Sequence, residues 1–157
     1  MSYTMQGVVG DAHLLAATAI GPTVPLAQGK ALLLFTDRLR DQHALPFLPL
    51  TDEAAPNELP EPIRRLCARL SANGQIAYIE AELFGGQGTQ AAALWNRGQL
   101  VQPPLIAREA INEALRALGV QVTTGVDEFA ALALGTHRDI EDWGLAPALA
   151  AIQKRRD

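Results

Sequence analysis

The clearest pattern of apolar and polar positions lies between residues 75 and 95. Because side chains alternate across a β-strand, segment 75–84 has two different faces. One face is aliphatic and the other carries aromatic and acidic side chains: Ala77, Ile79, Ala81 and Leu83 against Tyr78, Glu80, Glu82 and Phe84. A second such segment, 89–95, follows the loop Gly85-Gly86-Gln87-Gly88. The two segments are therefore predicted to pair as an antiparallel hairpin.

Apolar residues that recur every three or four positions predict helices elsewhere in the chain. The strongest helix signals are at 62–72, which begins with Pro62, and at 106–118, which Gly119 ends. Asp11 and Thr36 or Asp37 are suitable caps for two short helices. The remaining expected elements are helices at 12–20, 126–134 and 147–156, strands at 3–9 and 31–35, and a connection at 44–60 with an extended piece at 47–50.

These elements predict an α+β fold, in which several helices pack on a central antiparallel sheet that contains the glycine-rich hairpin. A chain of 157 residues has the usual length of one domain, and it contains neither a repeat nor a long polar linker. Residues 1–157 are therefore interpreted as a single domain.

The acidic and aromatic face of the hairpin is the most informative candidate surface. If the four-residue glycine loop sets the register, Phe84 pairs with Thr89, and Tyr78 pairs with Trp95. Glu80 and Glu82 would then lie over an alanine floor, pointing outward between aromatic side chains. Two neighbouring carboxylates raise one pKa, as in general acids, but they also suit the solvent face of a half-buried sheet. The candidate binding residues are Tyr78, Glu80, Glu82, Phe84, Gln90 and Trp95.

Composition and charge exclude several classes of protein. Thirteen basic and seventeen acidic residues give a net charge of −4, and aromatic residues make up only 5%, which argues against a nucleic-acid partner. No apolar run is long enough to span a membrane. The single cysteine, Cys67, excludes an internal disulfide and favours the cytoplasm, and its place on an apolar helix face predicts an inert thiol.

The sequence contains no complete catalytic or cofactor motif. The glycine loop follows a strand with two glutamates and lacks the acidic residue of a dinucleotide site, so a hairpin turn is the simpler interpretation. His137 and Glu141 are four residues apart and make at most half of a metal site. We expect no metal and no cofactor. The weak catalytic candidates are Glu80, Glu82 and His137.

Two segments in the second half of the chain carry a resemblance to a known family. They are AELFGGQGTQAAALW at 81–95 and DEFAALALGTHRDIEDW at 127–143. They resemble the patterns A-E-x-F-G-G-x-G-x-Q-A-A-x-x-W and D-E-F-x-A-L-x-L-G-x-H-R-x-x-E-D-W of small bacterial proteins to which no activity is assigned. The resemblance implies no reaction. By analogy alone, small proteins of this kind sometimes neutralise a toxin encoded nearby.

The leading functional hypothesis is a cytoplasmic, non-enzymatic accessory that binds another protein, as an immunity protein or an adaptor does. Tyr78 and Trp95, flanked by carboxylates, would suit a basic partner surface. The alternative is a small-molecule-binding protein or hydrolase that uses Glu82 and His137, with or without a metal; it predicts that Glu82, Gln90 and His137 converge. A third interpretation is a homodimer formed through the hairpin edge.

Overall fold

The strand-forming segments assemble into one antiparallel sheet. The computed structural model describes residues 2–51, 58–84, 87–134 and 140. Six strands lie in the order β2-β3-β1-β4-β5-β6. Their bounds are β1 Ser2–Asp11, β2 Val24–Pro25, β3 Lys30–Leu34, β4 Gln75–Phe84, β5 Gln87–Asn96 and β6 Gln99–Ile106. The α+β class with a central antiparallel sheet is confirmed.

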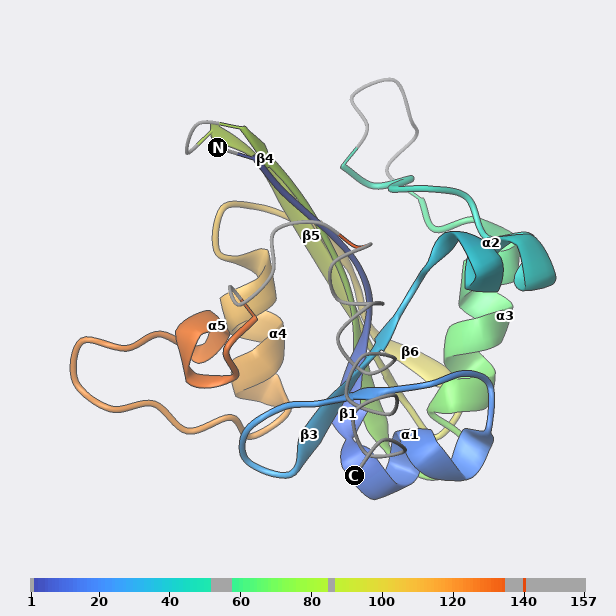
Figure 1. The fold of residues 1–157 in the computed structure, drawn as a ribbon, viewed down its shortest axis with the longest axis horizontal. Coiled ribbons are helices and arrows are strands. Elements are labelled where there is room, and N and C mark those ends of the chain that lie inside the picture. Colours follow the sequence, from blue (N-terminus) through green and yellow to red (C-terminus); the bar gives the residue numbers. More distant parts are fainter. Residues whose placement is uncertain (1, 52–57, 85–86, 135–139, 141–157) are drawn as a thin grey trace, which may run out of the picture.

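Helices cover both faces of this sheet. Figure 1 shows α1, α2 and α3 on one side, and α4 and α5 on the other. The bounds are α1 Ala12–Thr18, α2 Asp37–His43, α3 Glu61–Leu70, α4 Ala110–Ala117 and α5 Glu128–Ala131. Each face therefore has its own hydrophobic core, one under α1–α3 and one under α4 and α5. Among the described residues, no helix combines the length and the apolar character that crossing a bilayer requires.

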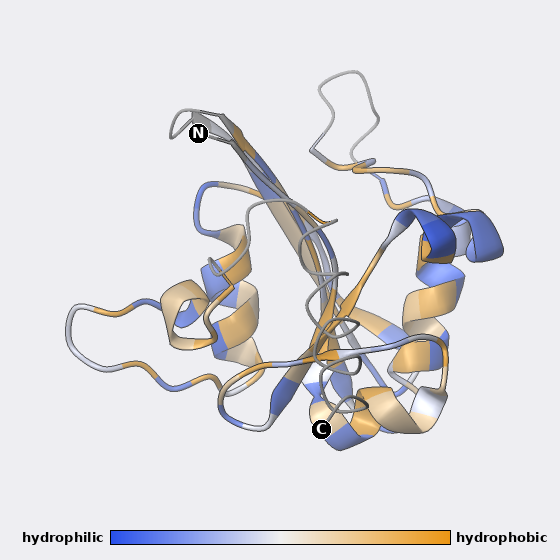
Figure 2. Cartoon of the chain, in the orientation of Figure 1, coloured by the Kyte–Doolittle hydropathy of each residue, from blue (hydrophilic) through white to orange (hydrophobic). Residues whose placement is uncertain are grey.

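The strongest helix signal formed as expected. In α3 the buried residues are Ile63, Leu66, Cys67 and Leu70, which recur on one helical face. Figure 2 shows the corresponding alternation of apolar and polar residues along α3. Thr36 caps α2, because its Oγ1 accepts a hydrogen bond from the Leu39 amide at 3.2 Å. Local sequence signals were therefore sufficient for these two helices.

Helix ends differ from the sequence prediction where a side chain or a neighbouring strand takes another role. Asp11 precedes α1 without capping it, because its carboxylate binds Lys30 at 2.7 Å. Helix α1 ends with Ala19 as its left-handed cap residue, slightly before the predicted end at residue 20. Helix α4 begins at Ala110 instead of residue 106, since Ile106 belongs to β6. Helix α5 is shorter than predicted, and the helix expected at 147–156 lies outside the described residues.

The β4–β5 hairpin formed, but its predicted register is wrong by two residues. Phe84 pairs with Gln87 and Glu82 with Thr89, so only residues 85 and 86 separate the two strands. The loop was expected to contain four residues, and Gln87 and Gly88 belong to β5 instead. A shift of two positions preserves the faces of a strand. Tyr78, Glu80 and Glu82 therefore still share one face, and Tyr78 lies opposite Ala93 rather than Trp95.

Strands β2 and β6 were not predicted. β6 contains Pro103-Pro104, and prolines argue against a strand because they lack the N–H that a sheet uses. β6 lies at an edge of the sheet, where this loss is tolerated. Its pairing with β5 also contains register shifts between Ala92 and Trp95.

Segment 44–51 forms turns rather than the predicted extended piece. Its leucines Leu45, Leu48 and Leu50 are buried. Leu45 and Leu50 belong to the core under α1–α3 and lie close to the strand face that carries Tyr78. This connection is therefore part of the cover of the sheet, with direct consequences for the candidate site.

Candidate functional site

The carboxylate of Glu80 is buried and hydrogen-bonded rather than exposed. Its side chain is 0% exposed. Oε1 accepts hydrogen bonds from the amides of Leu50 and Thr51, each at 3.0 Å, and from Thr51 Oγ1 at 3.1 Å. Oε2 accepts one from the Tyr78 hydroxyl at 2.5 Å. Glu80 thus fixes the turn at residues 50–51 onto the sheet.

Gln6 extends this buried polar group onto β1, where it is paired with Glu80. Its Nε2 donates to the Tyr78 hydroxyl at 3.0 Å and to the Pro46 carbonyl at 2.9 Å. Its Oε1 is buried and has no hydrogen-bond partner among the described residues. The Glu80 cluster, defined as Gln6, Thr51, Tyr78 and Glu80, therefore ties segment 46–51 to two central strands.

Burial dominates the protonation of this cluster. Desolvation raises the pKa of Glu80 above its ordinary value, against the opposing effect of the hydrogen bonds from Tyr78, Thr51 and Leu50. Desolvation, together with the neighbouring Glu80 carboxylate, raises the pKa of Tyr78. Protein atoms cover both side chains. Their hydrogen bonds to Gln6, Leu50 and Thr51 hold distant segments together, which is a structural role.

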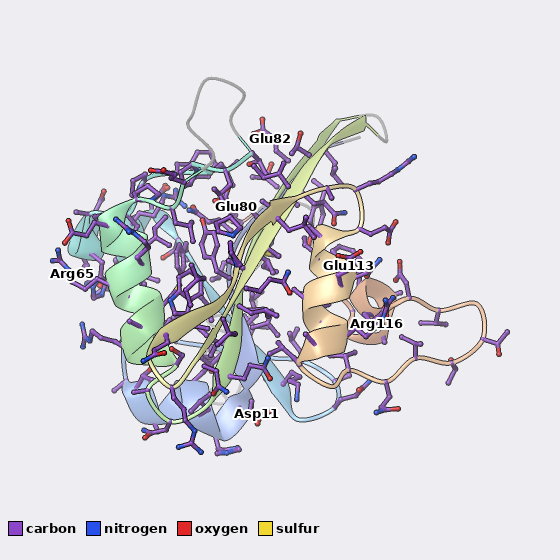
Figure 3. The ribbon with its side chains drawn as sticks, turned by 180° about the vertical axis from the view of Figure 1, so that it is seen from behind. Asp11, Arg65, Glu80, Glu82, Glu113 and Arg116 are labelled. Carbon is purple, nitrogen blue, oxygen red and sulfur yellow. The ribbon has the colours of Figure 1, made fainter. Side chains whose placement is uncertain are left out.

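The predicted outward-facing acidic and aromatic surface is wrong. Tyr78 and Glu80 are buried, and Trp95 is 2% exposed. Segment 44–51 and α3 cover the sheet there, which the strand pattern could not reveal. Figure 3 shows Glu80 on the α3 side of the sheet and Glu82 farther toward the β4–β5 turn. Glu82 is partly exposed, so the paired carboxylates that suggested a basic partner do not form an exposed pair.

The other predicted site residues do not gather around Glu82. Gln90 is paired with Ala81 and lies on the opposite face, where its Oε1 accepts a hydrogen bond from the Ile111 amide at 3.3 Å. The expected convergence of Glu82 and Gln90 is therefore wrong. The side chain of Phe84 and all of His137 lie outside the described residues, so a hydrolase that uses Glu82 and His137 stays a prediction.

The described part of the chain offers neither an exposed cysteine nor a group of side chains suited to a metal. Cys67 is fully buried, and desolvation raises the pKa of its thiol, which agrees with the predicted inert core residue. No group of three or more histidine, cysteine, aspartate and glutamate residues suited to a metal occurs among the residues that the structure describes.

An exposed feature that the sequence did not predict is the outer edge of β6, with which no other strand among the described residues pairs. This strand is the last in the sheet and pairs with β5. Leu100 is 43% exposed and Val101 is 54% exposed. We define the β6 edge as residues 99–102, the half of the strand that precedes Pro103-Pro104. Two neighbouring apolar side chains on an open edge are unusual, because such edges invite pairing with another chain.

A hollow of about 410 Å³ lies beside this edge. It is lined by Glu61, Arg64, Arg65, Ala68, Trp95 and Gly98, and is called the arginine hollow here. The β5–β6 turn is docked on the end of α3, because the Gly98 amide donates to Ser71 Oγ at 3.1 Å. Leu100 is paired with Trp95, which lines the hollow. The hollow therefore adjoins β6 through Gly98, which precedes the strand, and through Trp95, the pairing partner of Leu100.

Comparisons with models of known protein families, with curated proteins and with solved structures give no match. The resemblance to small bacterial proteins accordingly stays a prediction.

Proposed function

We propose that this chain is a non-enzymatic accessory protein that binds another protein by adding a strand of the partner to the β6 edge. In strand addition, the backbone of an extended segment pairs with an exposed edge, and alternate side chains give specificity. The observation that carries the proposal is the combination of an edge left unpaired by the described part of the chain with the exposed side chains of Leu100 and Val101.

The two halves of β6 differ in sequence, and this difference supports β6 as the binding edge. Proteins protect edge strands from unwanted pairing with prolines, charges or bulges. Pro103-Pro104 provides such protection in the second half of β6, and Pro25 does so on the opposite edge strand, β2. The first half has neither proline nor charge and carries the exposed apolar side chains of Leu100 and Val101, although its pairing with β5 shifts register between Leu100 and Gln102. The exposed apolar side chains favour a selected contact.

The proposal also includes the expected setting: a bacterial cytoplasm and a role like that of an immunity protein or an adaptor. What changes from the sequence hypothesis is the surface. The face around Tyr78 and Glu80 is covered, and the exposed apolar residues that the proposal uses, Leu100 and Val101, lie on β6.

Affinity capture with matched variants tests the function. The bait would be the full chain, the edge variant Leu100→Glu/Val101→Glu, or the control variant Val122→Glu/Val126→Glu. Val122 and Val126 are also exposed, at 48% and 38%, but lie in the segment before α5. We expect a stoichiometric partner with the wild type and the control, and its loss with the edge variant at unchanged thermal stability. A partner retained equally by the edge variant would exclude β6 as the binding surface.

A further inference from the structure

The arginine hollow beside the β6 edge carries a charge opposite to that of the whole chain. The chain has a net charge of −4, yet the hollow is lined by Arg64 and Arg65 against one carboxylate, Glu61. Arg97, which precedes Gly98 in the adjoining turn, is exposed as well. Within the described residues, neither Arg64 nor Arg97 forms an ion pair. Positive side chains therefore outnumber negative ones in the hollow and the adjoining turn.

Of the ion pairs that the described residues form, one lies at the hollow, and it leaves most of this charge available. Arg65 donates to Glu61 at 2.7 Å, and both side chains are 69% exposed. An exposed pair of this kind contributes little to stability and exchanges readily with other partners. The hydrogen bond and charge of Arg65, aided by Arg64, lower the pKa of Glu61. A second carboxylate brought here would meet two guanidinium groups.

From these observations we infer that the partner strand is acidic, and that its carboxylates bind in the arginine hollow while its backbone pairs with residues 99–102. This inference depends on the proposed function and names the chemistry of the partner. Alternate side chains of an added strand would point to the α3 side of the sheet. Arginine binds carboxylates through paired hydrogen bonds, which suits such an arrangement.

A second copy of this chain fits the same edge less well. If two antiparallel β6 strands related by two-fold symmetry paired along their full length, they would pair about their midpoint, between Gln102 and Pro103. Each proline pair would then face the other copy's open half and remove donors from the shared ladder. The positive hollows would also lie on the same side of the joined sheet. An acidic strand confined to residues 99–102 avoids both penalties.

Three synthetic peptides test the inference on the intact protein. Each has seven residues that alternate valine with glutamate, glutamine or lysine, and binding is measured by fluorescence anisotropy at low salt. We expect the glutamate peptide to bind at least about tenfold more tightly than the glutamine peptide, with an advantage that falls as salt is added. The lysine peptide should bind most weakly.

Matched charge reversals identify the responsible side chains. Arg64→Glu should abolish the preference for the glutamate peptide, whereas Arg38→Glu should leave it unchanged. Both arginines are exposed and lie on helices, but Arg38 belongs to α2 and does not line the hollow. Equal binding of the glutamate and glutamine peptides to the wild type would overturn the inference, and so would loss of the preference in both variants.

If the proposed function itself is wrong, these experiments give results different from those that overturn only the inference. Absence of binding by all three peptides, or glutamate-peptide binding that survives Leu100→Glu/Val101→Glu, would overturn the β6 edge itself and the inference with it. Analytical ultracentrifugation provides the remaining control. A dimer that Leu100→Glu/Val101→Glu dissociates would show that a second copy occupies the edge, and would also overturn the inference.

Discussion

Glu80 joins parts of the molecule that are distant in the sequence. Its carboxylate accepts hydrogen bonds from β4 and from residues 50 and 51. Burying a charge is costly, and hydrogen bonds offset only part of that cost. Desolvation is accordingly the largest effect on its pKa, which is raised.

The raised pKa determines the sign of its effect on stability. The folded state holds the Glu80 proton more tightly than the unfolded chain does. The contribution of Glu80 to the free energy of unfolding is therefore complete below the unfolded-state pKa, about 4.3. It declines as the pH rises through the folded-state pKa and is constant above it.

Urea unfolding of the wild type and of Glu80→Gln at successive pH values tests this behaviour. We expect the wild-type free energy of unfolding, minus that of the variant, to fall above about pH 4.3 by at most about 1.4 kcal/mol per pH unit. In a Tyr78→Phe background the fall should extend to higher pH, because the Tyr78 hydroxyl lowers the Glu80 pKa. If the difference in free energy of unfolding between the wild type and Glu80→Gln did not change with pH, this would contradict a raised pKa of Glu80.

At the scale of elements, Gly88 fixes how β5 leaves the turn of the β4–β5 hairpin. It has a φ of +146°, and a Cβ at this position would lie 2.1 Å from the Glu82 carbonyl oxygen. Gly29, in the turn before β3, also has a positive φ of +71°, but a Cβ there would have no atom within 4 Å. A side chain at position 29 would therefore meet only an unfavourable backbone conformation, whereas a side chain at position 88 would also clash with the neighbouring strand.

Alanine substitution at each glycine should show this separation in the free energy of unfolding. We expect Gly29→Ala to cost about 1 kcal/mol, from backbone conformation alone. Gly88→Ala should cost more than about 3 kcal/mol, because the hairpin must also move apart. Chemical denaturation measures both. Equal costs would show that the close approach at Gly88 is absent in solution.

At the scale of the whole molecule, Cys67 reports on the integrity of the core under α1–α3. Its thiol is fully buried, and only a large opening of the fold would expose it. The residue after Ser71 at the end of α3, Ala72, is exposed and offers a matched position on the same segment.

Thiol labelling under native conditions measures how readily the core under α1–α3 opens. We expect Cys67 to react at least about a thousandfold more slowly than the introduced thiol of Ala72→Cys in a Cys67→Ala background. Labelling of Cys67 within about tenfold of that control would mean that the core opens locally around α3.

Elements with strong local signals were predictable from the sequence. The apolar spacing of α3, the Thr36 cap of α2 and the alternation in β4 each reflect interactions within one segment. β6 had a weaker signal: Leu100-Val101 follows the turn at Arg97-Gly98, but the two prolines argued against a strand. Only its place at the sheet edge makes those prolines acceptable.

The candidate site was less predictable, because exposure depends on what covers a face. Alternation correctly assigned Tyr78, Glu80 and Glu82 to one face of β4. It could not show that Leu45 and Leu50 pack over that face, because segment 44–51 has no periodic pattern. The arginine hollow was equally hidden, since Arg64 and Trp95 are brought together from separate elements.

The sequence by itself therefore determined the α+β class, the main helices and the two faces of the hairpin. These properties arise from side-chain periodicity and capping between near neighbours in the chain. Only the tertiary structure decided that Glu80 is buried, that the hairpin register is shifted and that β6 is the last strand of the sheet that the described residues form. Those outcomes depend on contacts between distant segments, whose packing determines which polar groups lose water and which strand remains unpaired.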